Sequence, residues 1–255
     1  MRTTDADVAV ADRPAPADPS AAAPSPQDAG EASPKELSDF MKGRSRTYGM
    51  LARIFRVEAD QEFVGELRSM RFPTSTGNAH ADRGYRLMCN YLRGVWEDTQ
   101  LDLARDYMRT FIGHGVNGRS AAYPYESVHT SEKRLLMQGA RDEVLAIYRA
   151  NNLKKDERWR DCEDHIALEL EFMQVMAGRT AKALAEYRED DAIEMLRTQR
   201  DFVENHLANW VPIFVEDIMR WSQTDFYRGA GELLLGFVQT EREALADMLD
   251  ESDAQ

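Results

Sequence analysis

The sequence predicts an all-α protein. Apolar residues recur at helical spacing through nearly the whole chain after residue 33. Helix-starting residues precede several of these runs, and no alternation of apolar and polar residues is long enough to indicate a half-buried strand. We therefore expect a single helical-bundle domain of about ten helices. They are predicted near residues 34–56, 61–70, 80–97, 99–112, 131–150, 161–178, 181–188, 190–209, 211–222 and 225–250.

Residues 1–33 are expected to form a disordered tail in front of this domain. They contain ten Ala, five Pro, one Gly and no aromatic residue. Such a composition offers little apolar surface to offset the entropy of ordering the chain. Residues 34–255 contain all 23 aromatic residues. With 222 residues (255 − 33), this part is long enough to bury roughly 70% of its unfolded surface.

The first two helices have recognisable starts. Ser33 and Glu36 match a capping box, in which each side chain accepts a hydrogen bond from the other residue's backbone N–H. Pro34 stands at the first helical position, where its fixed φ suits a helix. Asp60 is expected to cap the second helix, and Pro73 with the polar residues after it predicts a loop to about residue 78.

The next two helices are predicted from apolar faces that are rich in aromatic residues. The faces consist of Tyr85, Met88, Tyr91, Leu92, Val95 and Trp96 in the first, and Leu103, Tyr107, Met108 and Phe111 in the second. Residues 113–130 then form the one long irregular segment, rich in Gly and aromatic residues. The remaining helices follow it with short connections.

The acidic balance of the chain narrows the classes of partner. The formal net charge is −13, and the tail contributes −4 of it, which leaves −9 for residues 34–255. Nucleic acid and anionic membranes would be repelled, whereas a basic peptide would be attracted. The charge could equally serve solubility alone. We therefore expect neither nucleic acid nor an anionic membrane as a partner.

The remaining bulk features predict a cytoplasmic protein. No apolar run near the N-terminus resembles a secretory signal, and no apolar stretch is long enough to enter and span a membrane. Cys89 and Cys162 have no zinc-like spacing, so reduced thiols are the simplest interpretation.

Two motifs resemble sites but stand in the wrong context. Residues 113–118 match G-x-G-x-x-G, yet the motif follows a predicted helix, whereas a dinucleotide site needs it after a strand. Glu126 and His129 form one E-x-x-H motif, whereas di-metal bundles use two on facing helices.

One row of side chains leaves an enzymatic alternative open. Asp161, His165 and Glu169 fall at positions i, i+4 and i+8, so they could share a helix face and hold a divalent ion. The alternative function is a helical metal- or nucleotide-dependent hydrolase. Ordinarily such a row is a cap, a helix-terminal histidine and a solvated acid. No other group of residues is a candidate for catalysis.

Six blocks of residues, in this order, resemble the TorD family of redox-enzyme maturation chaperones. They cover residues 48–52, 107–111, 123–128, 163–173, 206–214 and 226–228. The resemblance implies an all-helical domain with a hinge-like loop between its N- and C-terminal parts. It also implies a non-enzymatic role, with no cofactor or metal held by the chain itself.

The resemblance implies the partner as well. Members of this family bind the twin-arginine signal peptide, and often the body, of an immature molybdopterin oxidoreductase of the dimethyl-sulfoxide-reductase class. They hold this client in the cytoplasm until its cofactor is inserted and then release it for export. A homodimer is left open, including one that exchanges helices across the hinge.

The family's peptide-binding loop and its P-x-D-H motif can be placed on this chain. The peptide-binding residues that the resemblance implies are Pro124, Tyr125, Ser127, Asp164 and His165, with Tyr48 at the place of a groove tyrosine. Tyr123 and Glu126, which belong to the same loop of Tyr and Pro residues, are further candidates for peptide contact. Cys162 stands where the family has the proline of the motif, so the φ restraint that proline gives is lost there. The structural alternatives are that His165 bonds its own helix turn and that Tyr48 is a core residue. His206 and Trp210, one turn apart, are interpreted as packing residues.

Overall fold

The structure is a computed structural model that describes residues 2–3, 33–94, 97–113, 121–131 and 135–253, and there it confirms the all-α class. The helices are α1 (Pro34–Arg56), α2 (Gln61–Ser69), α3 (Ala79–Arg93), α4 (Thr99–Tyr107), α5 (Glu126–Thr130), α6 (Gly139–Ala150), α7 (Ile166–Ala185), α8 (Glu189–Phe202), α9 (Ala208–Trp221) and α10 (Asp225–Asp253). Turns of π-helix, Met108–Ile112 and Val203–Leu207, continue α4 and α8. Two short strands, β1 (Arg2–Thr3) and β2 (Leu153–Lys154), pair antiparallel. Residues 4–32 of the predicted tail lie outside the described residues.

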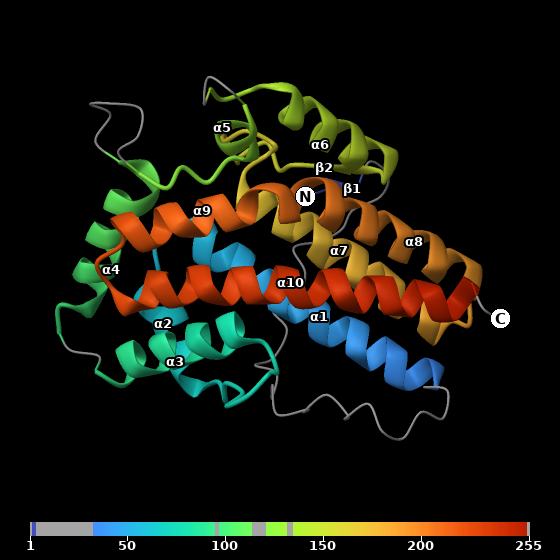
Figure 1. The fold of residues 1–255 in the computed structure, drawn as a ribbon, viewed down its shortest axis with the longest axis horizontal. Helices are drawn as coiled ribbons and strands as arrows, with labels where there is room; N and C mark the ends of the chain where they lie inside the picture. The colour runs from blue at the N-terminus through green and yellow to red at the C-terminus, as the bar shows by residue number, and fades with distance from the viewer. Residues whose placement is uncertain (1, 4–32, 95–96, 114–120, 132–134, 254–255) are drawn as a thin grey trace.

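The helices that begin and end the chain pack on those from its middle. Helix α10 crosses the molecule and packs against α3 on one side and α9 on the other (Figure 1). Helix α1 runs along α7. Helices α5 and α6 lie at the upper edge of the view in Figure 1, beyond α9. The fold thereby brings segments that are distant in sequence into one packed body.

Aromatic side chains from four elements fill the centre of this body. The ring of Phe55 in α1 lies 5.7 Å from that of Phe111 and 5.8 Å from that of Phe214. The Phe111 ring lies 5.4 Å from the ring of Tyr227 in α10. All four side chains are buried. Because edge-to-face aromatic contacts add to the stability that burial gives, these residues fix α1, α9 and α10 around the π-turn.

The predicted helix starts are confirmed at Ser33 and Asp60. The Ser33 hydroxyl accepts from the Glu36 N–H at 3.4 Å, and the Glu36 carboxylate accepts from the Ser33 N–H at 2.9 Å. Asp60 accepts from the Phe63 N–H at 2.8 Å. Each cap satisfies a backbone donor that the first turn of a helix leaves without an intrahelical partner.

Two glycines allow α3 and α10 to approach closely. A Cβ atom at Gly84 would lie 2.7 Å from the carbonyl oxygen of Gly229, and one at Gly229 would lie 2.8 Å from the carbonyl oxygen of Gly84. Any larger residue at either position therefore pushes the two backbones apart.

Several helix bounds differ from the prediction. Residues 161–178 and 181–188 were predicted as two helices, but α7 begins only at Ile166 and continues without a break to Ala185. The helix expected from residue 131 begins at Gly139, and the one expected to reach residue 97 ends at Arg93. Helix α5 lies within the segment predicted to be irregular. In the described residues, no helix is both long and apolar enough to cross a bilayer.

Candidate functional site

The structure brings the loop block and the Asp-His block together. The backbone N–H of Glu126 donates to the carbonyl oxygen of Asp164 at 3.0 Å, and that of Ile166 donates to the carbonyl oxygen of Pro124 at 2.9 Å. Tyr125 and His165 thus face each other as an isolated antiparallel bridge. The residues that precede α5 and those that precede α7 are about forty positions apart in sequence. These backbone hydrogen bonds hold them side by side.

Asp164 holds the beginning of α5 through its side chain. Its Oδ2 atom accepts a hydrogen bond of 2.9 Å from the backbone N–H of Ser127. The Asp164 side chain is completely buried, and so is that of Ser127. Because α5 has no side-chain cap of its own, this carboxylate takes the place of an N-cap and complements the positive end of the helix.

His165 caps α7. Its Nδ1 atom accepts a hydrogen bond of 3.0 Å from the backbone N–H of Ala167, so the ring proton is on Nε2. Burial lowers the pKa of His165 to about 4, although nearby Asp161 acts in the opposite direction. The imidazole is therefore neutral at physiological pH, as its role as a hydrogen-bond acceptor requires. This geometry agrees with the structural alternative for His165.

Two half-buried aromatic rings cover His165. The ring of Tyr125 lies 5.1 Å from the imidazole and that of Trp159 lies 5.3 Å from it, both edge to face. The hydroxyl of Tyr125 donates to the exposed carboxylate of Asp161 at 2.7 Å. We refer to the surface formed by Tyr125, Trp159 and Asp161 as the aromatic face.

An arginine already occupies part of the aromatic face. The guanidinium of Arg56, at the end of α1, lies 4.7 Å from the centre of the Trp159 ring. It also donates to Glu171 at 2.6 Å. The same side chain thus makes a cation–π contact and a charge-assisted hydrogen bond, which are the two interactions that best recognise a guanidinium.

A cluster of buried carboxyl groups lies behind the loop. The carboxylate of Glu126 accepts from Nδ1 of His206 at 3.0 Å, and Glu169 accepts from the indole N–H of Trp210 at 3.1 Å. Burial raises the pKa of Glu169 well above its usual value, and the neighbouring carboxyl groups of Glu126 and Asp164 raise it further. The surroundings of Glu169 therefore favour its protonated form. These contacts join α5 to the π-turn that follows α8, and α7 to α9.

The histidine and tryptophan that the sequence placed one turn apart thus do more than pack. Both are buried, as expected, but each also bonds to a glutamate on a different element. Sequence reasoning missed Glu126 and Glu169 as their partners. Glu169 stands among the apolar residues of α7, and this position could have indicated a buried glutamate that needs a polar partner.

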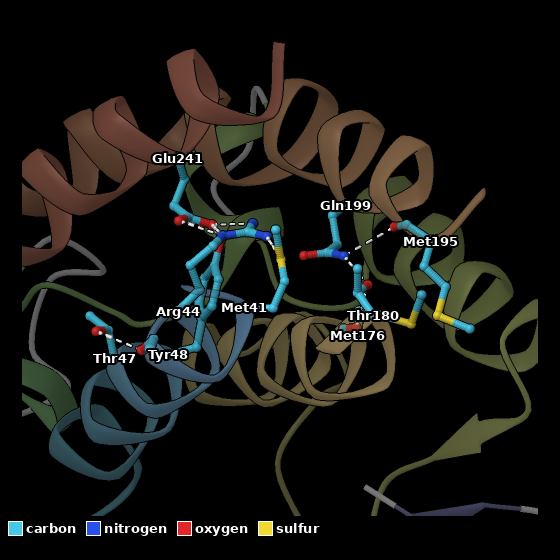
Figure 2. Close-up of polar contacts among 10 residues, drawn as sticks. Met41, Arg44, Thr47, Tyr48, Met176, Thr180, Met195, Gln199 and Glu241 are labelled. Atoms are coloured by element: carbon cyan, nitrogen blue, oxygen red, sulfur yellow. Dashed lines mark hydrogen bonds and ion pairs between the residues drawn. The ribbon is translucent and has the colours of Figure 1, made fainter. Parts of the chain in front are cut away.

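Tyr48 lies in a different part of the molecule. It is completely buried, and its hydroxyl donates to Glu241 of α10 at 2.6 Å. Arg44, one turn earlier in α1, donates to the same carboxylate at 2.9 Å through Nε (Figure 2). Figure 2 shows Arg44 and Tyr48 reaching from α1 toward Glu241. With α1 and α10 packed in this way, Tyr48 is not accessible to a peptide.

The row proposed for a hydrolase is not formed. Asp161 lies outside α7, His165 is the N-cap, and only Glu169 is within the helix. The expectation of a shared helix face was therefore wrong, because the chain turns between Cys162 and His165 before the helix starts. In the described ranges, no group of three or more His, Cys, Asp or Glu side chains is arranged to hold a metal ion.

The other motifs have structural roles or lie outside the description. His129 of the E-x-x-H motif bonds through Nε2 to the carbonyl oxygen of Tyr123 at 2.8 Å and stacks on Trp210. Residues 114–118 of the G-x-G-x-x-G match are outside the described residues. The turn that ends in His165 forms with Cys162 in place of proline, since the His165 N–H donates to the Cys162 carbonyl oxygen at 3.3 Å.

Comparisons with known proteins agree with the blocks found in the sequence. A model of the nitrate reductase delta subunit family matches residues 78–216, which is 139 of the 255 residues and runs from α3 into α9. Two proteins named "Chaperone protein TorD" are similar over most of their lengths. The one from Vibrio cholerae (strain N16961) is 25% identical over 86% of this chain and 99% of its own. The one from Vibrio parahaemolyticus is 29% identical over 81% of this chain and 96% of its own. The chain therefore belongs to the nitrate reductase delta subunit family, which is the family of the TorD- and NarJ-like chaperones.

Proposed function

We propose that the chain is a cytoplasmic chaperone for the maturation of a redox enzyme, and that its client is the precursor of a molybdopterin oxidoreductase. It binds the twin-arginine signal peptide and the body of this precursor, assists insertion of the cofactor and delays export until the client has folded. Family membership and the name of the relatives, which describes a non-enzymatic role, support the chaperone function.

The observation that carries the signal-peptide proposal is the arginine on the aromatic face. Arg56 stacks on Trp159 and bonds to Glu171, so this surface has the chemistry needed to hold a guanidinium. A client arginine would use the same interactions, or would stack on Tyr125 and bond to Asp161. The negative charge of the chain favours the approach of a basic peptide.

The predicted site residues divide into two groups by exposure. Tyr123 and Tyr125 are half-buried and are the ones that contact the peptide in this proposal. The residues that hold the loop in place are Pro124, Glu126, Ser127, Asp164 and His165, all of them buried. Tyr48 stays a prediction that requires α1 and α10 to separate.

A binding measurement with a synthetic peptide tests this function. The peptide carries an Arg-Arg pair followed by an apolar run, and a matched peptide has Gln-Gln in place of the pair. We expect calorimetry to detect the first and to give at least tenfold weaker binding for the second. Tyr125→Ala should weaken binding of the arginine peptide, whereas Tyr187→Ala, at a residue 78% exposed on another surface, should not. Equal affinity for the two peptides would contradict the proposal.

The identity of the client is tested separately. A tagged form of the full chain is expressed in its native cells, and the co-purifying proteins are identified by mass spectrometry. Recovery of one molybdopterin oxidoreductase that retains its signal peptide is the expected result. A client without a signal peptide, or one that holds no molybdopterin when mature, would reject this part of the proposal.

A further inference from the structure

Two glutamates from different elements are buried behind the candidate loop. Glu126 is the first residue of α5, and Glu169 lies in the first turn of α7. They are 3% and 0% exposed. A glutamate is almost never buried to this extent unless it is paired. Among the described residues, neither carboxyl group forms an ion pair with a Lys or Arg side chain. Their burial therefore depends on other partners.

These partners place the two carboxyl groups side by side. Glu126 accepts from His206 and Glu169 from Trp210, and the two donors are four residues apart, about one helical turn. His129, one turn after Glu126 on α5, stacks on Trp210 with 5.4 Å between the ring centres. Glu126 and Glu169 thus contact the same turn from opposite sides, and their side chains are hydrogen-bonded to each other.

A hydrogen bond between two carboxyl groups requires one proton, because an ionised carboxylate can only accept. Both oxygens of Glu126 accept from Nδ1 of His206, at 3.2 and 3.0 Å, as expected of a carboxylate. Glu169 accepts from Trp210 through Oε2, whereas its Oε1 atom is buried and meets no donor among the described residues. A proton on this oxygen of Glu169 would supply the bond to Glu126.

The other titratable groups around the pair do not neutralise a second negative charge. Asp164, before α7, is buried and acidic itself. The hydroxyl of Tyr148 on α6 donates to the carbonyl oxygen of Glu163, and its pKa is raised well above the usual value by burial and then by nearby carboxyl groups. His129 bonds through Nε2 to a backbone carbonyl oxygen. Within the described part of the chain, His206 is the other group around the pair that could carry the proton.

The position of α5 is sensitive to this arrangement. The helix has five residues and no side-chain cap of its own, and its first two N–H groups donate to Asp164. Helix α7 has twenty residues and is held along α1. Two ionised carboxylates in hydrogen-bond contact and out of water repel each other strongly. Because α5 is the shorter and less firmly held element, this repulsion would displace α5 and not α7.

We propose that one proton shared by Glu126 and Glu169 holds α5 against α7, and that release of this proton loosens α5 together with Tyr123 and Tyr125 in front of it. In the release step, the O–H bond of Glu169 breaks and the proton passes to a base in the solvent. The proposal adds a regulation of the loop that the proposed function assigns to the client peptide, and it rests on that function only for the identity of the ligand.

Hydrogen exchange in the free, full-length chain tests the proposal without a peptide. The amides of Glu126 and Ser127 report on α5, and those of Leu51 and Ile54, within α1, report on unfolding of the whole domain. Protection is expressed relative to the intrinsic exchange rate at each pH. Glu169→Gln and Glu126→Gln each leave an amide that can donate to the remaining carboxylate. Glu243→Gln, at an exposed position on α10, is the matched control.

In the wild type and in Glu243→Gln, we expect the protection of the α5 amides to fall by about tenfold between about pH 6 and about pH 9, while that of the α1 amides changes less. A tenfold fall corresponds to a pKa of Glu169 that is about one unit lower in the loosened state. Both variants of the pair should keep the same protection at the two pH values, and either one suffices if the other does not fold.

Constant protection of the α5 amides in the wild type would overturn the proposal. A fall that persists in Glu169→Gln would also overturn it, because the proton would then belong to His206 or to another group. Neither result bears on binding of an arginine peptide, which is measured separately. Failure of that binding would reject the proposed function and leave the shared proton as a property of the fold.

Discussion

The carboxylate of Asp164 accepts a hydrogen bond from the backbone N–H of Ser127, across 37 residues of sequence. This contact joins the segment that starts α7 to the first turn of α5. Both residues belong to the site implied by the family resemblance, and both are buried. Their relationship means that a change at Asp164 alters the position of the loop even if the side chain never contacts a ligand.

Replacement of Asp164 separates its acceptor role from its charge. Asp164→Ala removes the acceptor and leaves the Ser127 N–H buried without a partner, so we expect a loss of about 1–3 kcal/mol in the free energy of unfolding. Asp164→Asn retains an oxygen at the same place and should lose less. Urea denaturation measures the stability, and hydrogen exchange at the Ser127 amide reports the local contact. Equal protection of this amide in the Ala variant and the wild type would contradict the role assigned to Asp164.

Glu169 is expected to make stability decrease as the pH rises. Its folded-state pKa is raised, so between about pH 4.5, its ordinary pKa, and the raised value the folded state binds more protons than the unfolded one. Stability from this group is present below pH 4.5 and is lost as the pH rises through the folded-state pKa. Glu169→Gln imitates the protonated form and should be more stable than the wild type at pH 9, because the variant has no carboxyl group to ionise as the pH rises.

The comparison of stability at pH 5 and pH 9 measures this difference. Glu243→Gln, at an exposed position on α10, controls for the loss of one carboxyl group. A Glu169→Gln variant with the same change between the two pH values as the wild type would show that Glu169 is ionised in the fold.

The helices could be predicted from the sequence because their signals are local. The capping box at Ser33 and the apolar period of α1 depend on neighbouring residues, and both are confirmed. The start of α7 was placed too early because its N-cap is His165. Histidine is not among the usual capping residues, and here it caps only because burial keeps it neutral.

The candidate site could be named from the sequence but not assembled. The resemblance pointed to residues 123–127 and to Asp164 and His165, and the structure places these segments together. The contacts that surround these segments could not be predicted in the same way. Arg56 and Trp159 meet through the packing of α1 against the segment before α7, and no pattern within either segment encodes a contact between them.

The pair formed by Arg44 and Glu241 is expected to be costly to break. Both side chains are 3% exposed, and Tyr48 bonds to the same carboxylate. Glu241→Leu alone leaves a buried guanidinium without its partner, for which we expect a loss of about 3–5 kcal/mol. Combining it with Arg44→Met should recover much of this loss, because no charge is then buried. Urea denaturation of the two single variants and the double variant measures the coupling, and additive losses would show that the pair does not interact as described.

Removal of Arg56 tests whether the chain's own arginine competes with the client. Arg56→Ala removes the guanidinium from the face of Trp159 and from the carboxylate of Glu171. The variant should therefore bind an arginine-pair peptide about threefold more tightly, the value of one partly exposed cation–π contact. Arg53→Ala is the matched control, because Arg53 stacks on Phe63 and bonds to Asp60, away from Trp159. Calorimetry measures the affinity of the wild type and of both variants for this peptide. Weaker binding by Arg56→Ala alone would mean that Arg56 builds the surface instead of occupying it, and the client arginines would then belong at Tyr125 and Asp161.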